Sequence, residues 1–238
     1  MATVLLLRHG RTSTNASGTL AGHQPVGLDD VGRAQATAVG ARLAAAGLPL
    51  AAVVSSPLPR CRETLALALP TFTEVQEDEG IIECRYGDWT GQSLKNLAKD
   101  PLWTVVQTHP SAARFPGADA ESMAEMSARA INTVRAWDAR ITASHGPDAV
   151  WVACSHGDII KAIVADALGM HLDLFQRIAV DPASVTAVRY TPLRSFVVRL
   201  NDTGGDLQGF APPPKKRGRS SGTPSSDAAV GGGAGTTT

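Results

Sequence analysis

Apolar residues along this chain gather in short runs that alternate with longer stretches of helical periodicity. Two of the runs, 3–8 and 149–154, have the length and continuous apolar character of strands buried on both faces of a sheet. Further strands are expected at 51–55, 74–76, 184–191 and 195–201, with Pro192 at the turn between the last two.

Helices are expected in the intervals between these strands. Asp30 is expected to cap a helix that runs to about Ala46. Its apolar face is predicted at Val31, Ala34, Ala38, Val39, Leu43 and Ala46. Further helices are expected from Pro57 to about Leu69, from Asp119 to Gly146 and from Asp158 to about Leu168. Asp158 is interpreted as the N-cap of the last helix rather than as a catalytic group. Strands that alternate with helices indicate an α/β protein with helices on both faces of its sheet.

The chain is expected to hold one catalytic domain, 1–203, followed by a different kind of segment. Residues 204–238 are dominated by Gly, Pro, Ser, Thr and Ala without periodicity, which predicts a disordered tail. A basic cluster at 215–219 lies inside it and is interpreted as solvated charge. A contact of this tail with nucleic acid or another partner stays open as an alternative.

Composition narrows the classes of function. The formal net charge is +0, which argues against a protein that binds nucleic acid through a basic surface. The three cysteines are widely spaced and odd in number, so neither a disulfide framework nor a zinc site is expected. With no secretory leader and no apolar run long enough to span a membrane, we expect a cytoplasmic protein without membrane contact.

Candidate chemistry begins where the two long apolar runs end. The first ends at Arg8-His9-Gly10 and the second at Ser155-His156-Gly157. Two strands of one sheet can deliver both histidines to one edge, and an arginine beside the first indicates a dianionic phosphate there. Histidine can attack phosphorus directly if cations stabilise the phosphate oxygens.

Two further residues fit this chemistry. Arg60 follows the strand at 51–55 and falls in the first turn of a helix, where backbone N–H groups also favour anions. Glu83 follows two apolar residues, and a partly buried glutamate can hold the proton that an alkoxide leaving group needs. Arg62 is interpreted as an ordinary surface arginine.

Taken together, these pieces resemble the histidine phosphatase superfamily, also called the phosphoglycerate-mutase-like family. The matching segments occur in family order: Arg8-His9-Gly10 with Asn15, Ser56-Pro57-Leu58-Pro59-Arg60, Glu83 before Gly87-Asp88-Trp89-Thr90-Gly91, and Ser155-His156-Gly157. The resemblance implies a three-layer α/β/α sandwich with a mostly parallel central sheet. It makes His9 the nucleophile and Glu83 the proton donor. It places Arg8, Arg60 and His156 around the phosphate, and Asn15 matches a position that helps bind it.

The resemblance favours the phosphatase branch. The interval between Glu83 and His156 offers Lys95, Lys99 and Arg114, but not the cationic cluster that is usual in the mutase branch. We therefore expect hydrolysis of a small phosphorylated substrate, without metal or cofactor. A phosphoglycerate mutase-type phosphotransferase and a non-catalytic phospho-ligand binding module remain as alternatives. Trp103 and Phe115 are expected to line the mouth of the site. The sequence is silent on oligomeric state, and a homodimer stays open.

Overall fold

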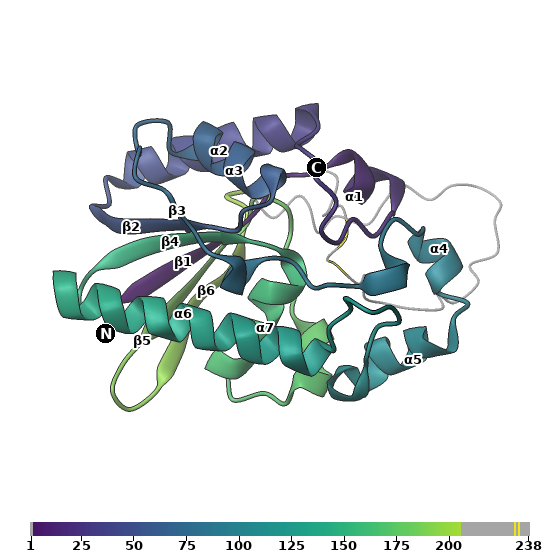
Figure 1. Cartoon of the computed structure of the whole chain (residues 1–238). Helices are drawn as coiled ribbons and strands as arrows, with labels where there is room; N and C mark the ends of the chain where they lie inside the picture. The colour runs from purple at the N-terminus through teal and green to yellow at the C-terminus, as the bar shows by residue number, and fades with distance from the viewer. Residues whose placement is uncertain (1, 206–230, 232, 234–238) are drawn as a thin grey trace, which may run out of the picture.

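Six strands form one sheet at the centre of the computed structural model, which describes residues 2–205 together with Gly231 and Gly233 (Figure 1). The strands are β1 (Thr3–Arg8), β2 (Leu50–Ser55), β3 (Gln76–Glu77), β4 (Val150–Ser155), β5 (Val185–Tyr190) and β6 (Ser195–Asp202). Their order across the sheet is β3-β2-β4-β1-β5-β6. The first four are parallel, whereas β5 runs antiparallel to β1 and β6 antiparallel to β5. The predicted tail lies mostly outside the described residues, including its basic cluster at 215–219.

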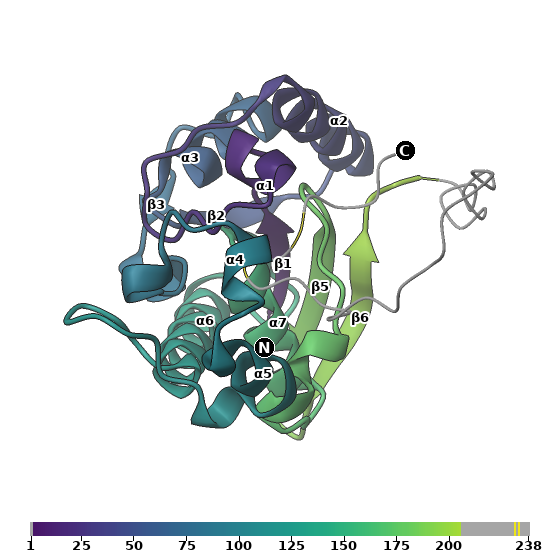
Figure 2. The same ribbon diagram turned by 90° about the vertical axis from the view of Figure 1, so that its right-hand side faces the viewer.

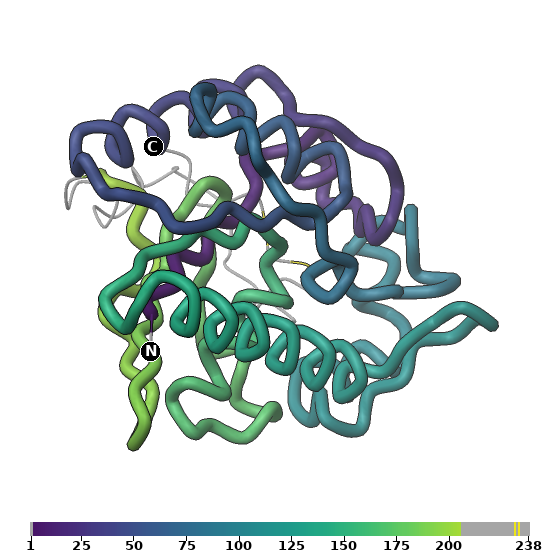
Figure 3. Tube along the Cα trace, turned by 60° about the vertical axis from the view of Figure 1, so that its left-hand side comes forward, coloured from purple at the N-terminus to yellow at the C-terminus, as the bar shows by residue number. Residues whose placement is uncertain are grey.

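Helices cover both faces of this sheet. Helices α2 (Asp30–Ala46) and α3 (Pro59–Ala68) lie on one face, and α6 (Met123–His145) and α7 (Gly157–Ala167) lie on the other (Figures 1 and 3). The buried side chains form two clusters, one for each face. The predicted three-layer α/β/α sandwich is therefore confirmed.

Short helices gather at one end of the sheet (Figure 2). They are α1 (Ser13–Ser17), α4 (Leu94–Leu97) and α5 (Pro101–Thr108), with 3-10 turns at Glu79–Ile81, Gly87–Trp89, Pro110–Ala112 and Leu172–Arg177. Within 81–120, Pro101 begins α5 and Pro110 begins the 3-10 turn after it. Because a proline lacks the N–H that would continue a preceding helix, each begins a separate short piece. Within 2–205, no helix is long and apolar enough to cross a lipid bilayer.

Helix α2 differs from its prediction in both its cap and its face. Asp29, not Asp30, is the N-cap, and its side chain accepts a hydrogen bond from the backbone N–H of Gly32. The buried residues are Gly32, Ala36, Val39 and Gly40, whereas Val31 is 43% exposed. The buried face consists largely of small residues because the helix backbone lies very close to its neighbours. A Cβ at Gly40 would come within 2.6 Å of the Ala68 carbonyl oxygen.

Three other local predictions are corrected. Helix α3 begins at Pro59 rather than Pro57. Trp103 and Phe115 do not line the mouth of a site, because both are buried and pack their rings against Trp89. Asp158 does not cap α7, because the N-cap position is His156 and no side chain caps that helix.

Candidate active site

The two histidines meet because their strands are neighbours in parallel register. Arg8 at the end of β1 pairs with Ser155 at the end of β4. The next residue, His9, donates its backbone N–H to the Ser155 carbonyl at 3.0 Å. The rings of His9 and His156 consequently lie 5.2 Å apart between centroids, tilted by 58°. The sheet thus brings together two histidines that are separated by most of the chain.

Gly10 fixes the path of the chain immediately after the first histidine. A Cβ there would lie 2.5 Å from the carbonyl oxygen of Gly32 in α2, so no larger residue fits. The Gly10 backbone N–H donates to the Thr64 hydroxyl at 2.9 Å, and that hydroxyl donates to the Arg60 carbonyl at 2.7 Å. Gly10 therefore allows the chain to pack closely against α2.

The ring of His9 has a defined proton arrangement. Its Nδ1 lies 2.7 Å from the Gly10 carbonyl oxygen. A carbonyl can only accept, so Nδ1 carries the proton and Nε2 keeps its lone pair. Burial lowers the pKa of His9 well below its usual value, and the charges of Arg60 and Arg8 lower it further. The ring is therefore neutral at physiological pH, with an unprotonated nitrogen available as a nucleophile.

Both nitrogens of the His156 ring have partners. Arg60 Nε donates to Nδ1 at 3.3 Å, so Nε2 bears the proton and donates to the Ser56 hydroxyl at 2.7 Å. Burial lowers the pKa of His156 well below its usual value, with the Arg60 charge as the next cause. In this arrangement His156 has no lone pair facing away from its neighbours, unlike His9.

Arg60 joins His156 to the loop that follows β1. It lies in the first turn of α3, is 2% exposed, and donates to the carbonyls of Gly22 at 2.8 Å and Gln24 at 3.3 Å as well as to His156. Arg62, two residues further along the helix, is exposed and pairs with Glu77 at 3.3 Å. The structure thus separates the two arginines into one buried and one surface residue.

Arg8 supplies a second buried guanidinium. It is 1% exposed and donates to the Val180 carbonyl at 2.7 Å and to the Gly233 carbonyl at 3.0 Å. Burial lowers the pKa of Arg8 to about 10, partly opposed by the charges of Glu83, Asp181 and Asp158. The group therefore remains a cation at neutral pH.

Glu83 faces both the cations and the histidines. It is 3% exposed, and its Oε2 lies 3.9 Å from Nδ1 of His156. Burial, followed by the charge of Asp158, raises the pKa of Glu83 to about 7, whereas Arg60 and Arg8 act in the opposite direction. A carboxyl with this pKa exchanges its proton near neutral pH, as a general acid must.

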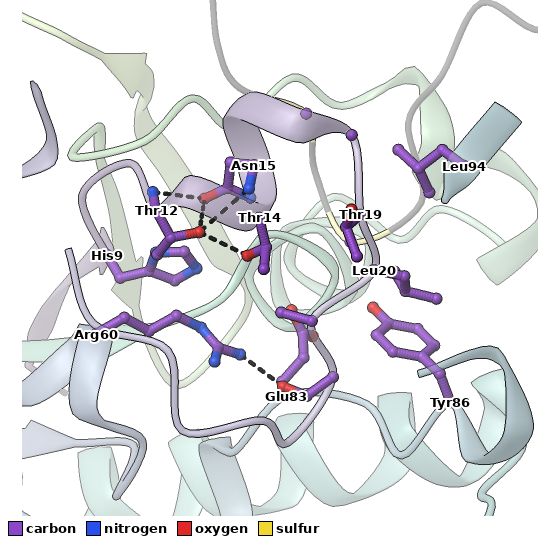
Figure 4. Close-up of a pocket in the computed structure, with 15 residues that line it drawn as sticks. His9, Thr12, Thr14, Asn15, Thr19, Leu20, Arg60, Glu83, Tyr86 and Leu94 are labelled. Atoms are coloured by element: carbon purple, nitrogen blue, oxygen red, sulfur yellow. Dashed lines mark hydrogen bonds between the residues drawn. The ribbon is translucent and has the colours of Figure 1, made fainter. Parts of the chain in front are cut away.

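Asn15 lines the same pocket, on the side opposite Glu83 (Figure 4). Its Oδ1 accepts hydrogen bonds from the backbone N–H and the hydroxyl of Thr12, and Thr12 caps the short helix α1. Asn15 therefore lies beside the histidine, but its carbonyl oxygen is held by the turn rather than by the pocket. The predicted site residues His9, Asn15, Arg60 and Glu83 all line this pocket.

Asp158 and Tyr86 lie at the site, although neither was assigned to it from the sequence. Asp158 is fully buried, and its Oδ2 accepts from the Tyr86 hydroxyl at 2.8 Å and from the Gly231 N–H at 2.9 Å. Lys161 Nζ approaches its Oδ1 at 3.7 Å. Tyr86 lines the pocket together with Glu83. Asp158 is thus an electrostatic neighbour of the site, and only the fold reveals that its side chain turns inward.

Ser56 is a further residue whose place could have been read from sequence. It directly follows β2, a strand that ends at the same edge of the sheet as β1 and β4. Its hydroxyl orients His156. Among the described residues, no cluster of three or more His, Cys, Asp or Glu side chains has the arrangement of a metal site.

Comparison with known proteins identifies the family. A profile of the histidine phosphatase superfamily (branch 1) matches residues 4–203. The match spans nearly the whole described region and includes both histidines, so the chain belongs to the histidine phosphatase superfamily.

Relatives of the chain include named phosphatases. Glucosyl-3-phosphoglycerate phosphatase of Mycolicibacterium vanbaalenii is 32% identical over 174 residues, covering 71% of this chain and 76% of that protein. Bifunctional protein Rv2228c of Mycobacterium tuberculosis is 31% identical over 84% of this chain, which spans only 54% of that relative's length. The solved structure of the mycobacterial glucosyl-3-phosphoglycerate phosphatase Rv2419c with VO3 has a TM-score of 0.71 and 26% identity, covering 84% of this chain and 98% of that one.

Proposed function

We propose that the chain hydrolyses small phosphate monoesters through a phosphohistidine on His9. The observation that carries the proposal is the neutral His9 ring, whose free Nε2 shares a pocket with a buried guanidinium and a carboxyl that titrates near pH 7. Its membership in a superfamily with named phosphatases supports the same reaction. The catalytic unit in this proposal is the domain at 1–203.

In the first step, Nε2 of His9 forms a bond to phosphorus while the ester oxygen departs. Glu83 gives its proton to that oxygen, which leaves as an alcohol. Arg8, Arg60 and His156 stabilise the phosphoryl oxygens, since charge-assisted hydrogen bonds to fixed donors are strongest in a buried site. His156 can donate from Nδ1 only after that nitrogen gains a proton, which a bound dianion favours.

In the second step, water attacks the phosphohistidine. The Glu83 carboxylate accepts a proton from this water, the P–N bond breaks, and its electron pair returns to Nε2. Inorganic phosphate leaves, and Glu83 is again protonated. One carboxyl thus serves as the acid in the first step and the base in the second, which a pKa near neutrality permits.

The mutase alternative finds less support. A mutase needs cations for a second anionic group of its substrate. Lys95, Lys99 and Arg114 are the basic residues predicted in the interval, and none lines the pocket within the described residues. Arg114 instead pairs with Glu125 at 3.0 Å on the surface.

The test is phosphate release from a panel of phosphorylated metabolites by the purified chain, with Arg60→Ala and Arg62→Ala as a matched pair. Arg60→Ala should lose activity by roughly 10²–10³-fold, and Arg62→Ala should retain it because its side chain is at the surface. Equal losses in both variants would contradict the proposed phosphate pocket. With 3-phosphoglycerate and a bisphosphate primer, isomer formation faster than phosphate release would favour the mutase. Phosphate binding without release would favour the non-catalytic module.

A further inference from the structure

Two glycines distant in sequence from the catalytic domain lie inside the proposed phosphate pocket. Gly231 and Gly233 line it together with His9, Arg60 and Glu83. They are drawn as short yellow pieces at the end of the sheet that carries the histidines (Figures 1 and 2). With the two glycines in place, the pocket has about 30 Å³ of space for water-sized molecules, room for only one or two of them. A phosphoryl group is several times larger than a water molecule, so it cannot share the pocket with both glycines.

The contacts of these glycines use polar groups of the site. The Gly233 carbonyl accepts from Arg8 Nη2 at 3.0 Å, so a backbone oxygen occupies a donor that the reaction would direct at phosphate. The Gly231 N–H donates to Asp158 Oδ2 at 2.9 Å. The backbone N–H of Gly231 therefore pairs with the Asp158 carboxylate, and the backbone carbonyl of Gly233 pairs with the Arg8 guanidinium.

The site selects glycine for two geometrical reasons. Gly231 has a φ of +73°, in the left-handed region where other residues are strained. A Cβ there would lie 3.0 Å from Leu20 Cδ1 and 3.6 Å from the Tyr86 hydroxyl oxygen. The positive φ is therefore the main reason that glycine is favoured at 231, and the close Leu20 methyl adds to it.

We propose that the mouth of the phosphate pocket is a binding site for glycine-rich polypeptide backbone, which Gly231 and Gly233 of the same chain occupy in competition with the phosphorylated substrate. This rests on the proposed function, because the competitor is the substrate of that reaction. Since an arginine–phosphate contact is roughly twice as strong as a neutral hydrogen bond, phosphate can displace the glycines. The glycines therefore compete with the phosphorylated substrate for the pocket and do not block it completely.

The test compares the full chain with Gly231→Val and with Gly222→Val, a matched change in the same glycine-rich region that leaves Gly231 and Gly233 intact. Binding of inorganic phosphate is measured by calorimetry. If the glycines fill the site in about two thirds of molecules, phosphate binds about threefold more weakly than to an open site. Gly231→Val should therefore bind phosphate about threefold more tightly than the unchanged chain and Gly222→Val. Equal affinity in all three proteins would overturn the proposal.

Two further measurements sharpen the result. A peptide of residues 228–236, added to the Gly231→Val protein, should compete with phosphate, and the same peptide with valine at 231 should not. The affinity of the unchanged chain for phosphate should not depend on protein concentration, because an intramolecular contact has a fixed effective concentration. A concentration dependence would assign the contact to a second copy and overturn the proposal for the same chain. Binding does not require turnover, so an absence of hydrolysis in every variant would refute the function and leave this test intact.

Discussion

The ends of β1 and β4 are alike in sequence and position, yet the histidines that follow them have different surroundings. His9 uses one nitrogen to bond the Gly10 carbonyl and keeps the other unprotonated. His156 has one nitrogen bonded to Ser56 and the other to Arg60. The parallel register brings both rings to one place, and the neighbouring polar groups leave a lone pair free on His9 but engage both nitrogens of His156. In the proposed reaction, this difference makes His9 the nucleophile.

The largest effect is expected from removing the nucleophile. His9→Ala should lower kcat by at least about 10⁴-fold on every substrate, because no covalent route remains. His156→Ala should cost roughly 10²–10³-fold, the usual loss for one donor to a developing anion. Steady-state kinetics would measure both, with the surface variant His171→Ala as a control of unchanged rate. Equal losses of kcat in His9→Ala and His156→Ala would contradict the proposal that His9 alone is the nucleophile.

Removing the acid should give a smaller loss that depends on substrate. Glu83→Gln should slow alkyl phosphates by roughly 10²–10⁴-fold. Nitrophenyl phosphate should suffer much less, since nitrophenolate leaves without a proton. The exposed Glu77→Gln serves as the control. Should both substrates slow equally, Glu83 would not be the proton donor.

A smaller effect, roughly fivefold to tenfold, is expected at the residue that orients His156. Ser56→Ala removes the acceptor of the His156 Nε2 proton, and a loss of about 1 kcal/mol per hydrogen bond corresponds to roughly fivefold to tenfold in kcat/KM. The exposed Ser144→Ala is the matched control. Unchanged activity of Ser56→Ala would mean that Arg60 and packing alone orient the ring.

The smallest change concerns pH. Because burial and Asp158 raise the pKa of Glu83 to about 7, its proton is present below that pH and is lost above it. The kcat/KM for an alkyl phosphate should therefore fall as pH rises through about 7. Asp158→Asn removes a negative neighbour, so it should lower the pKa of Glu83 and move this fall to lower pH. If the pH profile of kcat/KM does not shift in Asp158→Asn, the charge of Asp158 does not affect the pKa of Glu83.

Sequence predicted the parts of the molecule that depend on continuous patterns. The apolar runs that became β1 and β4 gave the sheet, and the residues at their ends gave the two histidines. The predicted face of α2 was right at Val39 but wrong elsewhere. The rest of its buried side is made of Gly32, Ala36 and Gly40, small residues that a search for large apolar side chains passes over. Backbone-to-backbone closeness of this kind leaves little trace in hydrophobic periodicity.

The direction in which a side chain points was the second feature that could not be predicted from the sequence. Asp158 was expected to cap α7, but that helix has its N-cap at His156, two residues earlier, and the Asp158 carboxylate accepts from the Tyr86 hydroxyl instead. Trp103 and Phe115 were placed near the site from their position in the sequence, whereas they pack on Trp89. The contacts of Gly231 and Gly233 join residues too far apart in sequence for any local pattern to reveal.

The central claim is that His9, and not His156, carries the phosphoryl group. It is tested most directly by rapid acid-free quenching of turnover with a phosphate-labelled ester, followed by peptide mapping of the protein-bound label. Label on the peptide containing His9, retained in His156→Ala and absent in His9→Ala, is the predicted result. Label on the His156 peptide, or a full rate of hydrolysis with no bound label at any time, would contradict the account.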